Sequence, residues 1–243
     1  MAQHFISPLS GSLPPMGVDR LLKDARAHKQ TNSNASEDIL PSPSPYKNRQ
    51  KMTTLNNAPI GWRIISSKSV YSNYFISLYE DTLGVNGKEK IYVRGIRKDY
   101  STVVPFISSD EILIIKSYRH IVDSVEIEVP SGYIDEGESA KQAAIRELAE
   151  ETGYSAEDVI SIGSYTLDYS MFEQKGNLFI AYGLSKEQEQ SLGMMEKIET
   201  ESMKVKEIEE LLLEGKISNA ASIVALYRAI GYHKKKQVTT ASR

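Results

Sequence analysis

Three acidic side chains, Glu147, Glu150 and Glu151, lie three and four positions apart in the segment RELAEETGY. In a helix, at about 100° per residue, all three fall on one face. Like charges at these spacings cost an isolated helix roughly 0.2–0.5 kcal/mol per pair, and we expect no Lys or Arg on that face to offset them. Oxygen ligands at this density suit a hard divalent cation, Mg²⁺ or Mn²⁺. The alternative is a solvated acidic helix face, the more common explanation of so short a pattern.

The flanking residues predict where this helix begins and ends. Ser139 and, three residues later, Gln142 form the pattern of a capping box, and Gly153 is the usual left-handed stop. We therefore predict a helix over residues 140–152. The opposite face of that helix is less polar and is expected to pack on the protein through Ile145, Leu148, Ala149 and Thr152.

The composition limits the classes of function. The 243 residues are 40% hydrophobic and carry a net charge of −3, which describes a globular protein without a large basic field for nucleic acid. The absence of cysteine excludes disulfides, thiolate metal sites and cysteine nucleophiles. No apolar run is long enough to span a membrane. We expect a cytoplasmic protein that binds a small molecule, with neither nucleic acid nor membrane as partner.

The acidic helix is part of a longer pattern. The chain reads Gly132, five residues, Glu138, seven residues, and then residues 146–154. This spacing is similar to the Nudix box, G-x5-E-x7-R-E-U-x-E-E-x-G-U, in which U is a bulky apolar residue. Only Tyr154 departs, because an aliphatic residue is more common at the last position. The full pattern favours a metal site over a solvated helix face.

The resemblance implies an activity and roles for the box residues. Nudix proteins hydrolyse a nucleoside diphosphate linked to another group, using one to three divalent metals. The resemblance implies that the box glutamates are the metal ligands, and that the carbonyl of Ser131 is a further candidate ligand. Metals of this kind neutralise charge on the phosphates and lower the pKa of a bound water, whose proton a carboxylate takes. The catalytic candidates in the box are therefore Glu147, Glu151 and Arg146.

Three further box positions are implied to be structural. Arg146 and Glu138 would form an ion pair that orients the glutamates, the alternative being a surface pair of little energetic consequence. Gly132 and Gly153 would shape the backbone at the two ends of the box.

The chain divides into three parts by composition. Residues 1–57 hold six of the nine prolines and few aromatic residues, so they cannot bury enough apolar surface to offset the entropy of ordering. We predict a disordered tail there, with organelle targeting and a start at Met52 as alternatives. Residues 58–233 are expected to form the Nudix domain, and residues 234–243 a basic, flexible C-terminus.

The domain is expected to be rich in strands. Apolar and β-branched runs predict strands at 63–65, 70–79, 90–97, 102–107, 112–116, 125–129, 160–167, 177–182 and 204–205. Asn86 and Gly87 predict a tight hairpin turn. Helices are expected at 207–214, ended by Gly215, and at 220–230. This order indicates an α+β fold, and the resemblance makes it a Nudix-fold α/β/α sandwich with a mixed sheet and a preceding β-rich N-terminal extension.

Two flanking segments indicate a subgroup. The run from 117 to 138, including SYRH and EIEVPSGYIDEGE, resembles the ADP-ribose and nucleoside diphosphate sugar pyrophosphatases, as does EGKISNAAS at 214–222. One feature departs from that subgroup, because the loop 167–172 lacks the proline that these hydrolases usually carry. The expected substrate is ADP-ribose or a similar compound, split into a nucleoside monophosphate and a sugar phosphate.

Other residues are candidates for contact with the substrate. Tyr118, Arg119 and Tyr169 could contact adenine, ribose or phosphate, with ordinary packing or surface roles as the alternative. Phe172 and Tyr165 are expected in the core.

In the resembling subgroup the general base is a glutamate on a mobile loop after the box. The matching segment is 185–202, and its ending favours Glu199 or Glu201, with Glu196 as a further candidate. A loop in this place could close over the substrate.

A homodimer is also expected. The extension at 62–79 is rich in aromatic and β-branched residues, which need cover, and in the resembling hydrolases this extension is exchanged across a two-fold axis. Packing of these strands on their own domain is the alternative. Two further functions stay open: a dinucleotide polyphosphate or nucleotide hydrolase of the same fold, and a non-catalytic ligand sensor. A Nudix-like isopentenyl diphosphate isomerase is excluded, since it needs a catalytic cysteine.

Overall fold

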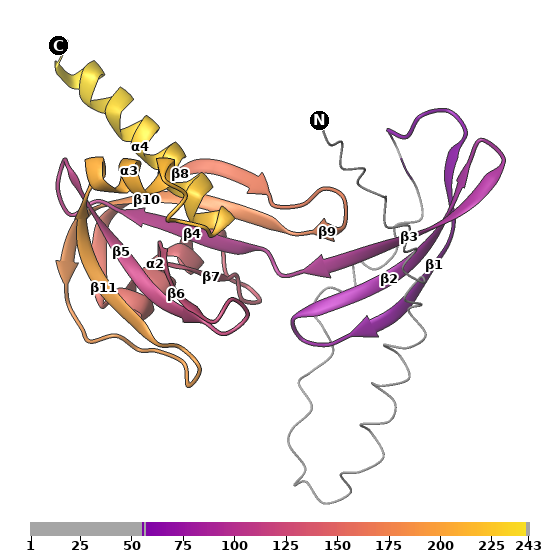
Figure 1. Ribbon diagram of the computed structural model, residues 1–243, viewed down its shortest axis with the longest axis horizontal. Helices are drawn as coiled ribbons and strands as arrows, with labels where there is room; N and C mark the ends of the chain where they lie inside the picture. Colours follow the sequence, from indigo (N-terminus) through magenta and orange to yellow (C-terminus); the bar gives the residue numbers. More distant parts are fainter. Residues whose placement is uncertain (1–54, 56, 242–243) are drawn as a thin grey trace, which may run out of the picture. The chain divides into compact units, whose positions relative to one another are not determined.

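The computed structural model describes residue 55 and residues 57–241 (Figure 1). The predictions for the N-terminal tail and for Met52 fall almost entirely on residues outside that part, and the division between tail and domain stays a prediction. The residues that the structure describes form three sheets and three helices. None of the helices within residues 57–241 is long and apolar enough to cross a membrane.

The first sheet is the N-terminal extension, and it adds one short strand from the domain. Its order is β1-β2-β3-β9, with β1 (Trp62–Ser72), β2 (Ile76–Val85), β3 (Lys88–Arg97) and β9 (Phe172–Glu173). The β2–β3 hairpin turns at Asn86 and Gly87, both at positive φ, as predicted. The prediction of a single strand over residues 70–79 is wrong, because β1 ends at Ser72 and β2 begins at Ile76. The side chain of Asn73 accepts hydrogen bonds from the backbone N–H of Phe75 and Ile76, both at 2.9 Å, and this turn separates β1 from β2.

The second sheet is mixed, as predicted, and carries the box. Its order is β7-β4-β10-β8, with β7 (Ser131–Tyr133), β4 (Tyr100–Pro105), β10 (Lys175–Lys186) and β8 (Tyr154–Thr166). Strands β4 and β10 run parallel and the other pairs antiparallel. The third sheet is antiparallel, in the order β11-β5-β6, with β11 (Ile198–Lys204), β5 (Glu111–Arg119) and β6 (Ser124–Glu128).

The helices cover both faces of the second sheet (Figure 1). They are α2 (Ala140–Thr152), α3 (Val205–Leu213) and α4 (Ala220–Ala241). Because successive strand residues face opposite sides, Val103 packs with Leu148 of α2, whereas Val104 packs with Leu226 of α4. The predicted α/β/α sandwich is therefore confirmed.

Helix α4 is longer than predicted. The sequence predicts an end at Ile230 and a flexible segment from residue 234, but the helix continues to Ala241. Tertiary contacts hold it: the His233 ring stacks on Phe106 with centroids 4.2 Å apart, and its Nδ1 lies 3.0 Å from the hydroxyl of Tyr182. Gly231 does not stop the helix, because these contacts outweigh its low helix propensity.

Candidate active site

The predicted helix and its caps are present as expected. Helix α2 spans Ala140–Thr152, the Ser139–Gln142 capping box is formed, and Gly153 adopts the left-handed conformation with φ 77°. Four apolar or hydroxyl side chains anchor the helix: Ala143, Ala144, Leu148 and Thr152 are all buried. The prediction that Ile145 packs is wrong, since that side chain is exposed. The buried stripe also includes Glu151, so one acid of the motif faces inward.

Glu151 is a buried carboxylate beside strand β7. It is 5% exposed, and its Oε2 accepts a hydrogen bond of 3.0 Å from the backbone N–H of Ser131. Burial raises the pKa of Glu151 well above its ordinary value, and the charge of Glu147 raises it further. Burial likewise raises the pKa of Glu147, although Arg146 opposes this shift. Glu147 and Glu151 are neighbours and both have raised pKa values, so a cation bound between them would stabilise their charged forms.

Among the four motif glutamates, Glu138, Glu147, Glu150 and Glu151, Arg146 contacts all but Glu151. Its Nε and Nη2 donate to the two carboxylate oxygens of Glu138, both at 3.0 Å. Its Nη1 donates to Glu147 at 2.6 Å and to Glu150 at 2.9 Å. The expected absence of a cation near the acidic face is therefore wrong: Glu150 lies one turn from Arg146, and the long guanidinium side chain also reaches Glu147.

The arginine is also tied to the neighbouring strand. Its Nη2 donates to the carbonyl of Tyr133 at 2.9 Å, and the Arg146–Glu138 contacts hold the pKa of Glu138 below its ordinary range. The guanidinium thus links the loop before α2, the strand β7 and two of the three acids. The predicted ion pair of Arg146 with Glu138 is present, and its role in orienting the glutamates stays a prediction.

Gly132, the first glycine of the box, leaves room for the carboxylate of Glu147, which lies close to its backbone. A Cβ at Gly132 would lie 1.9 Å from Oε1 of Glu147. Any other residue here would push the Glu147 carboxylate out of its position between the helix and β7.

The donor chemistry of this cluster fits Mg²⁺ or Mn²⁺. All the candidate ligands are oxygen atoms, and two of the acids are held ionised only with difficulty. In the part of the chain that the structure describes, no three acids or histidines converge on one point as they stand. The carboxylates of Glu147 and Glu150 instead contact Arg146.

With this geometry in place, comparison with known proteins is informative. A family model described as the NUDIX domain matches residues 97–227, which is more than half of the chain. The chain belongs to the Nudix family. The match leaves out β1, β2 and nearly all of β3, and the expected extent of the domain, residues 58–233, stays a prediction.

Relatives of this Nudix protein are named for related activities. It is 31% identical to an ADP-ribose pyrophosphatase of Bacillus subtilis over 51% of this chain and 67% of that protein. It is 36% identical to an ADP-ribose pyrophosphatase of Saccharomyces cerevisiae over 43% of this chain and 52% of that protein. A crystal structure of an ADP compounds hydrolase superimposes with a TM-score of 0.65 at 25% identity, covering 72% of this chain and 95% of the other. The protein is thus a Nudix pyrophosphohydrolase.

Strands β5 and β6 bring a further ion pair toward the Nudix box. Arg119 donates from Nε and Nη2 to the two oxygens of Glu128, at 2.8 and 2.7 Å. Glu128 is 2% exposed, and this pairing raises the pKa of Arg119, with the charges of Glu151 and Glu196 adding to the effect. Arg119, predicted to contact substrate, is therefore already committed to Glu128. Sequence reasoning gave Glu128 no role, because β6, which reads SVEIE, carries a second acid at Glu126 and does not single Glu128 out.

The second predicted contact from this hairpin has a local partner. The Tyr118 hydroxyl donates to Asp123 at 2.8 Å, which raises its pKa. Its ring is partly exposed and stays a candidate for substrate contact.

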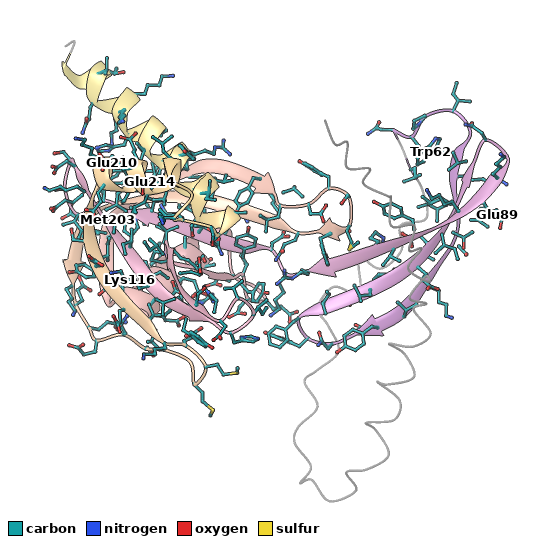
Figure 2. The ribbon with its side chains drawn as sticks, in the orientation of Figure 1. Trp62, Glu89, Lys116, Met203, Glu210 and Glu214 are labelled. Carbon is teal, nitrogen blue, oxygen red and sulfur yellow. The ribbon has the colours of Figure 1, made fainter. Side chains whose placement is uncertain are left out.

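The two favoured candidates for the general base do not lie on a loop. Glu199 and Glu201 belong to strand β11, where they pair in register with Lys116 and Ile114. Because side chains alternate along a strand, Glu199 and Glu201 lie on the same face of the third sheet as Ile114, which packs in the α3–α4 core. Arg119 and Glu128 lie on the opposite face of that sheet. Lys116, labelled on β5 in Figure 2, forms an ion pair with Glu201. The expectation of a mobile loop over residues 185–202 is wrong at both ends, because residues 185–186 belong to β10 and residues 198–202 to β11.

Glu196 is the loop acid that lies near the Nudix box. It precedes β11, and its negative charge raises the pKa values of Glu147 and Glu151. At present its Oε2 accepts a hydrogen bond of 2.7 Å from the backbone N–H of Gly193. The loop thus holds this carboxylate within electrostatic reach of the metal-ligand candidates.

Tyr169 is not grouped with the Nudix box. It lies on the loop between β8 and β9 and lines a large cavity beside the extension. Phe172 and Tyr165, predicted to be core, are both partly buried and line the same cavity. No residue of 132–154 lines it.

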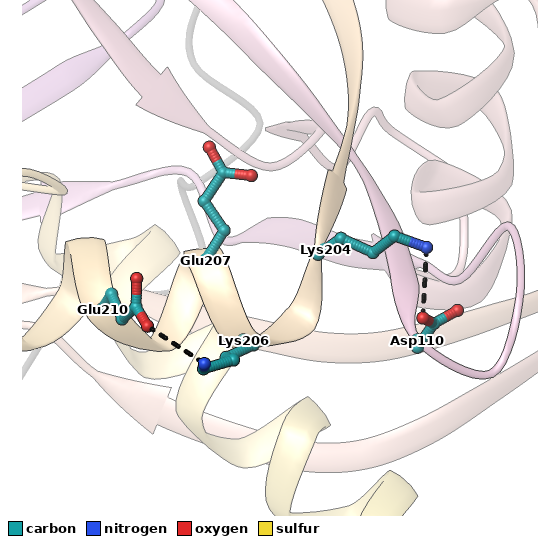
Figure 3. Close-up of a pocket in the computed structure, with 5 residues that line it drawn as sticks. All are labelled: Asp110, Lys204, Lys206, Glu207 and Glu210. Atoms are coloured by element: carbon teal, nitrogen blue, oxygen red, sulfur yellow. Dashed lines mark hydrogen bonds and ion pairs between the residues drawn. The ribbon is translucent and has the colours of Figure 1, made fainter.

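A smaller hollow of about 420 Å³ lies at the end of β11 (Figure 3). Four of its five charged lining residues pair with one another: Lys204 contacts Asp110 at 3.1 Å, and Lys206 contacts Glu210 at 3.8 Å, while Glu207 joins neither pair. We assign this hollow no function.

Proposed function

We propose that this Nudix protein hydrolyses ADP-ribose, or a similar nucleoside diphosphate sugar, to a nucleoside monophosphate and a sugar phosphate. The observation that carries the proposal is the buried Glu151 beside Glu147 and Ser131, a pair of acids that calls for a divalent cation. The names of the relatives support the choice of substrate. The flanking segments around the box support the same choice.

The roles of the box residues follow from their contacts. Glu147, Glu150 and Glu151 would hold Mg²⁺ or Mn²⁺, with the carbonyl of Ser131 as a further ligand. When bound, such a metal neutralises charge on the diphosphate and lowers the pKa of a water ligand. Arg146 positions the glutamates, because its guanidinium already contacts Glu147 and Glu150.

We assign the general base to Glu196 in place of Glu199 or Glu201. Its carboxylate is on a loop, so it can move toward a substrate bound at the glutamates, and its charge already acts on Glu147 and Glu151. A base must come within hydrogen-bond reach of the proton that it takes, and loop acids commonly do so only once substrate is bound.

Product analysis tests the substrate. With Mg²⁺ present, ADP-ribose and other ADP-sugars are expected to give AMP and a sugar phosphate, at a higher kcat/KM than nucleoside triphosphates or diadenosine polyphosphates. Release of products would be followed by chromatography at several substrate concentrations. Faster hydrolysis of triphosphates or dinucleoside polyphosphates than of every diphosphate sugar would replace our assignment with the alternative hydrolase activity.

We also propose a homodimer formed through the extension. Tyr79 is buried within the chain, but several apolar side chains of β1, of β3 and of the turn before β2 are exposed: Ile65, Val70, Tyr71, Phe75, Ile91 and Val93. Exposed apolar surface on this scale favours a partner, and an isologous pairing of two copies would cover it.

Light scattering at micromolar concentration is expected to give twice the chain mass of 27.2 kDa. Replacing Ile91, which is 64% exposed, with glutamate should shift the mass toward the monomer and lower activity, because the partner helps to shape the site. Replacing the exposed Lys90 with glutamate is the matched control on the same strand. A wild-type monomer with full activity would contradict both the dimer and the shared site.

A further inference from the structure

Lys98 is a buried cation in the two-residue link between strands β3 and β4. The residue is only 2% exposed, and a lysine is rarely buried to this extent without a partner. Its ammonium lies over the ring of Tyr74, 3.6 Å from the ring centroid, and 3.7 Å from Oδ1 of Asp135. Its backbone carbonyl accepts a hydrogen bond of 2.7 Å from the side chain of Gln174. These contacts fix the position of its positive charge.

The pairing of strands β4 and β7 places Asp135 opposite Lys98. Beyond the paired residues of these antiparallel strands, the backbone N–H of Ile134 still donates to the carbonyl of Asp99 at 3.0 Å. Continuing this register by one more residue sets Lys98 opposite Asp135. Opposite charges in such cross-strand positions attract each other. The ion pair therefore follows from the same register that places the first residues of the Nudix box.

Asp135 lies between this lysine and Arg146. Its Oδ1 contacts Lys98 at 3.7 Å, and its Oδ2 lies 3.9 Å from Nη2 of Arg146. The backbone of Asp135 also closes a turn with Glu138. Its N–H donates to Oε2 of Glu138 at 3.1 Å, and its carbonyl accepts from the backbone N–H of Glu138, also at 3.1 Å. Because Glu138 is itself bound to Arg146, this turn keeps Asp135 close to the guanidinium.

In the described structure, the five N–H donors of Arg146 are all used by acceptors other than Asp135. A guanidinium has one N–H at Nε and two at each of its terminal nitrogens. They are matched by five acceptors: both carboxylate oxygens of Glu138, one oxygen each of Glu147 and Glu150, and the carbonyl of Tyr133. At 3.9 Å, Asp135 is beyond hydrogen-bond distance.

Lys98 gives the Asp135 carboxylate a cation other than Arg146. Without that charge, Asp135 would compete with the present acceptors for Nη2 of Arg146, since charge-assisted hydrogen bonds are the stronger ones. The guanidinium is a rigid, planar fork. A rotation that brought Nη2 to Asp135 would therefore also move Nη1 away from Glu147 and Glu150.

We propose that Lys98 is a positioning residue of the Nudix box, which neutralises Asp135 and so keeps Arg146 on the glutamates that would bind a divalent cation. This inference rests on the proposed function, because it takes those glutamates as metal ligands. Tyr74, in the turn between β1 and β2, packs on the same ammonium. The extension thus acts indirectly on the metal site of its own chain.

Binding of Mn²⁺ alone to the full-length protein, without substrate, tests this role. Free Mn²⁺ would be measured by electron paramagnetic resonance. Lys98→Met removes the charge and is expected to raise the Kd for Mn²⁺ about tenfold, at the lower end of the roughly 10–100-fold range for groups behind metal ligands. Lys98→Arg keeps the charge and should bind Mn²⁺ nearly as the wild type does. Lys90→Met makes the same exchange at an exposed position of β3 and should have no effect.

A double variant separates positioning from a purely structural role. Adding Asp135→Asn to Lys98→Met removes the carboxylate that competes for Arg146, so the affinity for Mn²⁺ should return to that of the wild type. A purely structural role predicts no such recovery, because the double variant has lost both charges of the ion pair. Lys98→Gln, with and without Asp135→Asn, repeats the comparison, and melting temperatures show which variants are folded. The test therefore does not depend on the folding of Lys98→Met.

Three outcomes would overturn the proposal. The first is unchanged or tighter Mn²⁺ binding by folded Lys98→Met or Lys98→Gln, and the second is a double variant that binds as weakly as the single one. Either result, with a wild type that binds Mn²⁺, would leave the metal site in place and remove only the role of Lys98. The third is a wild type that binds no Mn²⁺, which would remove the proposed metal site as well. None of these readouts depends on which substrate is hydrolysed.

Discussion

Glu151→Gln is expected to lower kcat by more than about 100-fold with little change in thermal stability. Loss of residues that merely support metal ligands costs roughly 10–100-fold, and Glu151 is proposed as a ligand itself. The amide keeps the shape of the side chain and can accept the 3.0 Å hydrogen bond from Ser131. It also removes a carboxylate whose charged form is disfavoured by burial. The melting temperature should therefore hold or rise while turnover is lost.

The measurement is kcat at saturating substrate over a range of Mg²⁺ concentrations, together with the melting temperature. Glu89→Gln makes the same exchange at an exposed position of β3, far from the box in sequence (Figure 2), and should leave both quantities unchanged. Turnover by Glu151→Gln near that of the wild type would remove this residue from the metal site. A large drop in melting temperature would instead indicate that Glu151 is needed for the fold.

The sequence was most informative where structure is local. The bounds of α2 depend on contacts within a few residues, the Ser139–Gln142 capping box and the left-handed Gly153, and both were predicted correctly. The turn at Asn86 and Gly87 is local in the same sense. The C-terminal part of α4 was missed because contacts distant in sequence hold it, in particular the stacking of His233 on Phe106.

Two features of the site could not be read from the sequence. The polar run from Glu199 to Ser202 does not resemble a strand, and its pairing with β5 supplies the hydrogen bonds that make it one. Which face its acids occupy depends on register, since a shift of one residue exchanges the two faces. The reach of Arg146 to three acids depends on its rotamer, which the motif does not specify.

Glu196→Gln is expected to lower kcat by roughly 10²–10⁴-fold, the range for loss of a general base. The variant keeps an oxygen that can accept the hydrogen bond from Gly193, so the loop conformation should survive. Because Glu196 is proposed to act on a proton and not on the metal, the Mg²⁺ dependence and KM should change little. In Glu151→Gln, by contrast, the dependence on Mg²⁺ should shift.

Glu199→Gln and Glu201→Gln are the matched comparisons for Glu196→Gln, since they make the same exchange within five residues of it. Both acids lie on the face of β11 that turns away from Arg119 and Glu128, so turnover should fall by less than about threefold, within the roughly 1 kcal/mol scale of surface charge effects. The three variants, assayed at several pH values with ADP-ribose and Mg²⁺, show whether the general base lies on strand β11 or on the loop before it. If either strand variant loses activity while Glu196→Gln keeps it, then β11 must rearrange during catalysis and the base is on the strand.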